Sequence, residues 1–187
     1  MDIYLIRHTQ TATQKGLCYG QTDVDLAENY FVEFEKIRQK LPDIHENAQF
    51  FSSPLSRCQK LAEFLSTNVI YDNRLLEIDF GDWENQRFED LPEETLRHWT
   101  ENFVEIAPPN GESFHTLCER AEQFWQDIIQ LQTAQIFIVT HAGMIRALLA
   151  QILQLPPQNA FQFRVDCGSV HKFQRVENYT HIHFLNL

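Results

Sequence analysis

The sequence lacks any run of basic residues. Its 187 residues include 15 Lys and Arg against 26 Asp and Glu, which gives a formal net charge of −11. A surface of this charge repels nucleic acid, and no local basic cluster offsets the repulsion, so we expect no nucleic-acid partner. An anionic small molecule is compatible with the sequence, provided that a few cations are placed at its binding site.

Long apolar runs and paired cysteines are missing as well. The apolar segment 136–155 is interrupted by His141 and Arg146, and the apolar run near the start is too short for a secretory signal peptide. The four cysteines stand far apart: Cys18, Cys58, Cys118 and Cys167. Free thiols are typical of a reducing compartment. We therefore expect a cytoplasmic protein without a membrane partner.

Motifs of several other enzyme classes are absent. The sequence contains no Gly-rich Walker loop and no GxSxG nucleophile elbow. His181 and His183 would share one face of a strand, but no third metal ligand has a recognisable spacing from them. We therefore expect no metal ion.

What the sequence does contain is an alternation of strands and helices. Short apolar runs predict strands at 3–7, 49–52, 69–71, 136–140, 161–165, 170–173 and 182–185. Apolar residues at helical spacing predict helices at 28–41, 92–103, 112–131 and 142–153, and a further helix with Ser53 as N-cap and Pro54 at its first position. The alternation predicts an α/β fold, with one domain over 1–187, three α/β/α layers and a mostly parallel sheet. The acidic, aromatic segment 73–111 would be a small insertion of helix and loop over the site.

Three candidate functional residues follow predicted strands. His8 follows the first strand, Arg57 follows the second, and His141 follows the strand at 136–140. Ligands of α/β sheets bind beyond the carboxyl ends of the strands, so these residues would face one site. Arg57 would lie in the first turn of a helix, where its charge opposes the helix dipole by about 0.3–1 kcal/mol. A bound phosphate would reverse this cost, whereas an arginine that points away from the helix end is an equally weighted alternative.

Arg7 and His8 form a candidate pair at the first strand end. Successive strand residues point to opposite faces, so both can reach one site only where the chain turns. Imidazole can act as a nucleophile, as a base or, when protonated, as an anion binder, and a structural histidine is the alternative. A second histidine at an equivalent strand end, together with two arginines, favours a functional site over a structural role.

The segment 74–84 supplies candidate proton donors. Its carboxylates are Glu77, Asp79, Asp82 and Glu84. Protonation of a leaving oxygen needs one carboxyl whose pKa is raised by burial or by a nearby anion. A solvated acidic loop explains the other carboxylates, and residue types alone do not select the donor.

Five motifs occur in order along most of the chain: LIRHT, SSPLSRC, LLEIDFGDWE, NGESF and VTHAG. Together they resemble the histidine phosphatase superfamily, and within it the phosphoglycerate-mutase-like branch. The compact length and the segments FGDWE and NGES are most similar to the α-ribazole phosphatase group, which removes a phosphate in cobalamin nucleotide-loop assembly. The resemblance implies a phosphomonoesterase that needs no cofactor and acts on a small phosphorylated metabolite.

The resemblance also implies a role for each matching residue. His8 matches the histidine that becomes phosphorylated, and Glu77 matches the proton donor. The phosphoryl oxygens would be held by Arg7, Arg57 and a protonated His141. The substrate side would be formed by Gln14, Tyr19 and Gly20. The family's usual Gly and Glu after the nucleophile are replaced here by Thr9 and Gln10.

Several functions stay open at the level of sequence. The first is a phosphatase of α-ribazole 5'-phosphate or of a related small metabolite. A phosphoglycerate mutase is the second, although mutases of this type look longer and must retain the phosphoenzyme. A catalytically inactive phosphate-binding or scaffold protein is the third, and it would be expected to have lost His8 or Glu77. A monomer and a homodimer are both compatible with the sequence.

Overall fold

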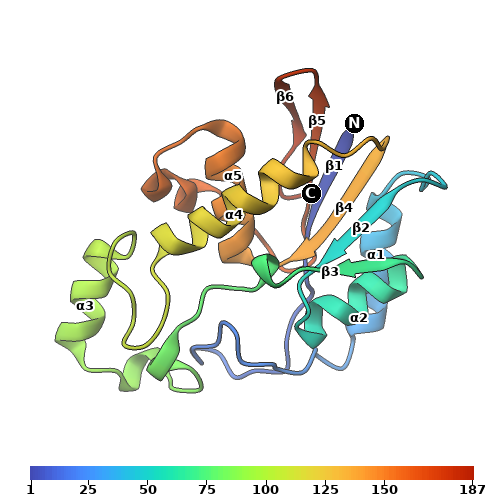
Figure 1. Cartoon of the computed structure of the whole chain (residues 1–187). Helices are drawn as coiled ribbons and strands as arrows, with labels where there is room; N and C mark the ends of the chain where they lie inside the picture. Colours follow the sequence, from blue (N-terminus) through green and yellow to red (C-terminus); the bar gives the residue numbers. More distant parts are fainter.

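A six-stranded mixed sheet forms the centre of the protein, whose computed structural model describes residues 1–187. Along the sheet the strand order is β3-β2-β4-β1-β5-β6 (Figure 1). The strands are β1 Asp2–Arg7, β2 Gln49–Ser52, β3 Val69–Tyr71, β4 Gln135–Thr140, β5 Val170–Val176 and β6 Tyr179–Phe184. The first four are parallel, and β5 and β6 pair antiparallel. The predicted α/β fold with a mostly parallel sheet is therefore confirmed.

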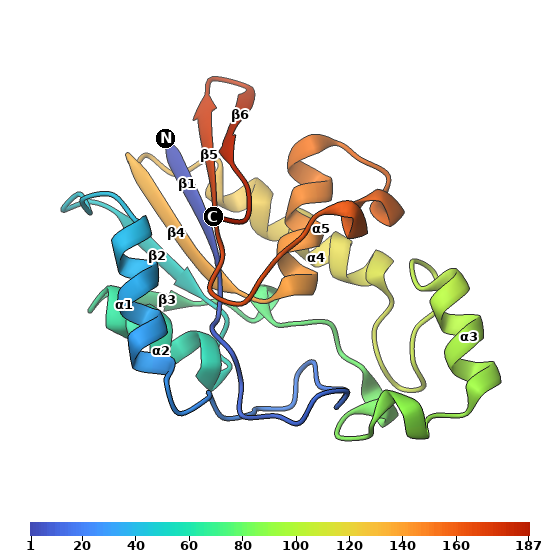
Figure 2. The ribbon, with the colours of Figure 1, turned by 180° about the vertical axis from the view of Figure 1, so that it is seen from behind.

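Helices cover both faces of this sheet, so the molecule has three layers. They are α1 Tyr30–Lys40, α2 Ser56–Leu65, α3 Glu93–Asn102, α4 Phe114–Ile128 and α5 Ala142–Leu153. The first two pack on one face, while α4 and α5 pack on the other (Figures 1 and 2). None of these helices combines the length and the apolar character that crossing a bilayer requires.

The central strand β4 joins the two cores, because its side chains alternate between the faces. All six of its residues are buried. The ring of Phe137 stacks on Tyr4 at 4.8 Å and on Phe50 at 4.5 Å between ring centroids, in the core under α1 and α2. Ile136 and Ile138 point the other way, into the core under α4 and α5. This fully buried strand therefore holds both helical layers on one sheet.

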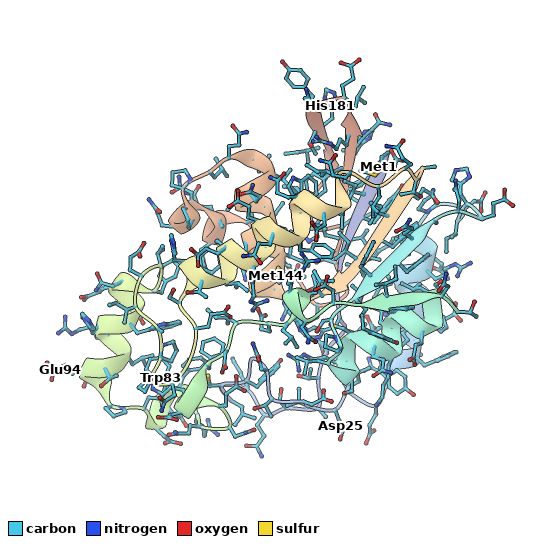
Figure 3. All side chains as sticks on the ribbon, viewed as in Figure 1. Met1, Asp25, Trp83, Glu94, Met144 and His181 are labelled. Atoms are coloured by element: carbon cyan, nitrogen blue, oxygen red, sulfur yellow. The ribbon has the colours of Figure 1, made fainter.

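The predicted insertion leaves the sheet after β3 and carries α3 at its far end (Figure 1). Trp83 lies within it (Figure 3) and is 4% exposed, packed in a small separate core with Cys18 and Leu91. The loop after β1 passes under the strand ends and reaches the insertion in both ribbon views. The amide of Cys18 donates to the carbonyl of Gln86 at 2.8 Å. Loop and insertion are thus joined beside the carboxyl ends of the strands.

Two sequence predictions about local structure are wrong. Residues 161–165 form no strand, because a 3-10 helix, Pro157–Gln162, places the ring of Phe161 against Phe103 and Phe114. Ser53 does not cap α2, which begins at Ser56 after the N-cap Leu55. The Ser53 hydroxyl instead contacts a buried histidine ring.

Truncation of Phe137 tests the role of β4. Phe137→Ala removes a fully buried ring that stacks on two others, so we expect a loss of about 3–5 kcal/mol in the free energy of unfolding. Urea titration measures this loss. Val32→Ala, at a side chain that is 56% exposed on α1, is the control and should change stability by no more than about 0.5 kcal/mol. A similar loss in both variants would contradict the account.

Candidate active site

Three strand ends meet at one edge of the sheet. The chain leaves β1 at His8, β2 at Ser53 and β4 at His141. Backbone bonds hold these ends together: the amide of His8 donates to Thr140 at 3.1 Å, and the amide of Ser53 donates to Val139 at 3.0 Å. The rings of His8 and His141 lie edge to face, with centroids 5.1 Å apart. The structure therefore brings together the two histidines that the sequence placed at equivalent strand ends.

His8 is held as a neutral ring with one free nitrogen. Its Nδ1 lies 2.7 Å from the carbonyl oxygen of Thr9, which can only accept a hydrogen bond, so Nδ1 carries the proton. The lone pair is then on Nε2. Burial, followed by the charges of Arg57 and Arg7, lowers the pKa of His8 to about 3. An unprotonated Nε2 is what nucleophilic attack by imidazole requires.

Arg57 carries a buried charge without a carboxylate partner. It is 0% exposed, and its Nη1 donates to the carbonyl of Thr22 at 2.9 Å. Nη2 donates to the carbonyl of Gly20, and Nε donates to Nδ1 of His141 at 3.2 Å. None of the protein's ion pairs involves this residue. Carbonyl dipoles only partly offset the cost of burying a cation, so the site favours an anion.

Arg7 adds a second positive charge of the same kind. Its Nη1 donates to the carbonyl of Val165 at 2.7 Å, and its Nε is buried without a partner. It takes part in no ion pair either. Its charge contributes to the lowered pKa of both His8 and His141. A locally positive site thus exists on a chain whose net charge is −11.

His141 differs from the sequence-based expectation of a protonated ring. Its Nδ1 accepts from Arg57, so that nitrogen carries no proton, and Nε2 lies 2.8 Å from the Ser53 hydroxyl. Burial, then the charge that His8 would carry if protonated, and then the charges of Arg57 and Arg7 hold the pKa of His141 well below its usual range. The ring is neutral in this arrangement. Nearby negative charge is what would raise its pKa.

The carboxylate of Glu77 reaches the first turn of α5, and two backbone N–H groups hold it, one from Ile78 and one from Gly143 of α5. Oε1 accepts from Ile78 at 3.0 Å, and Oε2 accepts from Gly143 at 3.1 Å. Arg120 donates to the carbonyl of Glu77 at 2.9 Å. A Cβ atom at Gly143 would overlap the Glu77 side chain, so glycine is needed for this close approach.

Glu84 organises the loop that holds Arg57, a role that sequence reasoning did not identify. Its carboxylate accepts from the amides of Gly20, Gln21 and Thr22 at 2.9–3.0 Å. Burial alone would raise the pKa of Glu84, but the bonds from Thr22 and the loop amides outweigh it and lower the pKa. The same loop turns its carbonyls toward Arg57. Glu84 is therefore no solvated loop residue, unlike what its acidic segment suggested.

Of the three residues expected on the substrate side, two contact Arg57 and one does not. The ring of Tyr19 lies under the Arg57 guanidinium, 5.5 Å from centroid to Cζ, and Gly20 accepts from Arg57. Gln14 is exposed and lines a separate cavity beside Tyr19. Thr9 is 1% exposed, and its hydroxyl has no partner. Tyr19 and Gly20 thus touch the arginine, whereas Gln14 does not.

Further supporting residues had no clear signal in the sequence. Ser53 was interpreted as a helix cap, but its hydroxyl contacts His141. Arg120 pairs with Glu112 at 2.7 Å and also donates to the carbonyls of Arg74 and Leu76. Glu112 belongs to the NGESF motif, which was the one available clue to this contact.

Comparison with known proteins agrees with this geometry. The family model described as histidine phosphatase superfamily (branch 1) matches residues 3–187. The adenosylcobalamin/alpha-ribazole phosphatase of Escherichia coli K12 is 29% identical over 177 residues, which cover 90% of this chain and 87% of that protein. Phosphoserine phosphatase 1 of Hydrogenobacter thermophilus is 26% identical, covering 90% of this chain and 84% of that protein. The crystal structure of the alpha-ribazole phosphatase from Shigella flexneri superposes with a TM-score of 0.89 at 27% identity, covering 100% of this chain and 96% of that one.

The chain belongs to the histidine phosphatase superfamily, branch 1. It is a phosphatase, and the proteins that it resembles in sequence and in structure include alpha-ribazole phosphatases.

The neutral state of His8 predicts how stability depends on pH. Unfolded histidine titrates near pH 6.5, whereas the folded pKa of His8 is about 3, so only the unfolded chain gains this proton as the pH falls below about 6.5. Stability should therefore decrease from about pH 7 to pH 5 in urea titrations. His8→Gln should make this decrease shallower, because the number of protons taken up on unfolding falls by up to about one. His98→Gln, at an exposed residue of α3, is the control, and an equal effect of both variants would contradict the account.

Proposed function

We propose that the protein hydrolyses a small phosphomonoester through a phosphohistidine formed on His8. One observation carries this proposal: Arg57 and Arg7 have no carboxylate partner, and their charges act on a neutral His8 whose Nε2 is unprotonated. A phosphoryl group supplies the missing negative charge, and it is also the group that an imidazole nucleophile can accept.

In the first transfer, Nε2 of His8 attacks phosphorus and the bond to the ester oxygen breaks. Arg57 and Arg7 stabilise the charge on the equatorial oxygens, since both are already in place and need little reorganisation. His141 lies beside Arg57, and its Nδ1 accepts the hydrogen bond from Arg57 Nε. The negative charge of the phosphate raises the pKa of His141, so that its ring can gain a proton when substrate is bound.

Glu77 completes the proton transfers. It donates a proton to the leaving alkoxide, and the alcohol departs. In the second transfer, water attacks phosphohistidine while Glu77 accepts a proton from that water. Inorganic phosphate leaves, His8 is again neutral, and Glu77 has regained the proton that it gave up. The N–H groups of Ile78 and Gly143 keep the carboxyl in one place throughout.

The substrate that we propose is α-ribazole 5'-phosphate or a related metabolite. Supporting this, the relatives named as alpha-ribazole phosphatases match the chain over 90–100% of its length. The relatives also include phosphoserine phosphatases, so a small metabolite is the wider class. The acidic surface and the four free cysteines favour a cytoplasmic location and argue against a nucleic-acid partner.

A panel of phosphate esters tests the function and the nucleophile together. Wild-type protein should release phosphate from α-ribazole phosphate with a higher kcat/KM than from phosphoglycerates, phosphoserine or sugar phosphates. His8→Ala should release none, while its thermal unfolding stays cooperative. Isomerisation of phosphoglycerate without phosphate release would identify a mutase instead. Wild-type rates in His8→Ala would show that another residue is the nucleophile.

Replacement of Glu77 tests the proton donor. Glu77→Gln should slow the hydrolysis of alkyl phosphates by about 10²–10⁴-fold, because an alkoxide leaves poorly without a proton. Hydrolysis of p-nitrophenyl phosphate should slow much less, since nitrophenolate is a good leaving group. The exposed Glu94→Gln is the matched control and should behave as wild type. Equal slowing of both ester types by Glu77→Gln would count against this assignment.

A further inference from the structure

Glu77 borders a cavity of about 150 Å³ whose walls are mainly aromatic. Together with Glu77 and smaller apolar residues, five rings line it: Phe80, Trp99, Phe103, Phe114 and Phe161. Four separate segments contribute: the insertion, the start of α4, the start of α5 and the 3-10 helix that follows α5. These walls therefore come from parts of the chain that only the folded protein brings together.

The aromatic walls pack on one another but leave space between them. Ring centroids lie 4.5 Å apart for Phe103 and Phe161, and 4.9 Å apart for Phe114 and Phe161. Trp99 contacts Phe80 and Phe103 at 6.0 and 6.5 Å. Phe161 nevertheless remains 47% exposed. An apolar group entering the cavity would cover part of this exposed surface.

The volume and the chemistry of the cavity indicate what fits it. An apolar cavity of roughly 150 Å³ in another protein stays dry and binds benzene. A small aromatic ring therefore matches the space, and aromatic walls offer it edge-to-face contacts. Because Glu77, the proposed proton donor to the leaving oxygen, lines the cavity, its occupant would be the part of the substrate attached to that oxygen.

Arg146 is the one cation in the lining, and it raises the alternative of a carboxylate ligand. Its guanidinium lies 5.2 Å over the ring of Phe161, and its Nε donates to the carbonyl of Phe163 at 3.3 Å. It is thus already used as part of the wall. A carboxylate would also approach Glu77 and lose water against apolar walls, whereas a neutral ring has neither cost.

We propose that this cavity is a specificity pocket for a planar aromatic ring carried by the leaving alcohol, with Phe161 and Trp99 as the residues that select it. The inference rests on the proposed function, since it assigns the leaving-group side of the same reaction. It extends that function by naming the chemical class that the pocket recognises.

Synthetic alkyl phosphates test the pocket without assuming a metabolite. The probes are 2-phenylethyl phosphate, 2-cyclohexylethyl phosphate, n-propyl phosphate and phosphoserine. All are esters of alkyl alcohols, so differences in kcat/KM report mainly on the attached group. We expect 2-phenylethyl phosphate to exceed n-propyl phosphate by about tenfold or more, the effect of burying one ring. It should also exceed the cyclohexyl ester and phosphoserine.

Variants of the lining connect this preference to the cavity. Phe161→Ala and Trp99→Ala should each lower the ratio of kcat/KM for 2-phenylethyl over n-propyl phosphate severalfold. Tyr179→Ala, at a ring that is 74% exposed on β6, should leave the ratio as in wild type. Two positions in different segments, each checked by thermal unfolding, separate a local effect from misfolding.

Each outcome bears on one proposal. A ratio near one in wild type, or a ratio that neither variant changes, would overturn the pocket and leave the phosphatase mechanism intact. Equal rates for the cyclohexyl and phenyl esters would overturn the selection of a planar ring. A preference for phosphoserine that Arg146→Gln removes would identify a carboxylate site instead. Folded wild-type protein that releases phosphate from none of the probes, nor from p-nitrophenyl phosphate, would refute the proposed function itself.

Discussion

Arg57 carries a positive charge into the interior of the protein, and much of the surrounding structure holds it there. The loop Gly20–Thr22 turns carbonyls toward its guanidinium, and Glu84 accepts hydrogen bonds from the amides of that same loop. Glu84 belongs to the insertion, so the insertion and the loop after β1 are joined around one cation. The remaining guanidinium nitrogen reaches His141 at the end of β4. A buried cation that is stabilised by dipoles alone favours the binding of an anion.

The two sides of the site have opposite character. On the phosphate side, burial together with the positive charges of Arg57 and Arg7 keeps both histidines neutral. On the leaving-group side, Glu77 borders a cavity with mainly aromatic walls. In the proposed function, charge selects the phosphate, and the shape and apolar surface of the cavity select the alcohol. This division explains how a chain of net charge −11 can accept a phosphate ester.

The strand ends were predictable from sequence, because short apolar runs that stop at His8 and His141 are typical of buried strands. The predicted insertion and most helices were also found. The roles of Ser53 and Glu84 could not be predicted, since each depends on a contact between segments that are far apart in the chain. The neutral state of His141 depends on burial and on the direction of one bond from Arg57. Residues 161–165 look like a strand, but Phe161 lies in a 3-10 helix and packs against the rings of Phe103 and Phe114. Local sequence patterns do not distinguish these two structures.

The central claim is that the phosphoryl group passes through His8. Its location during turnover can be determined by quenching the reaction at neutral to alkaline pH, where phosphohistidine survives, and mapping the peptides by mass spectrometry. The account predicts one phosphoryl group, on His8, that forms with substrate and disappears when substrate is exhausted. A phosphoryl group on any other residue, or turnover without a phosphorylated protein under conditions that trap phosphohistidine, would contradict it.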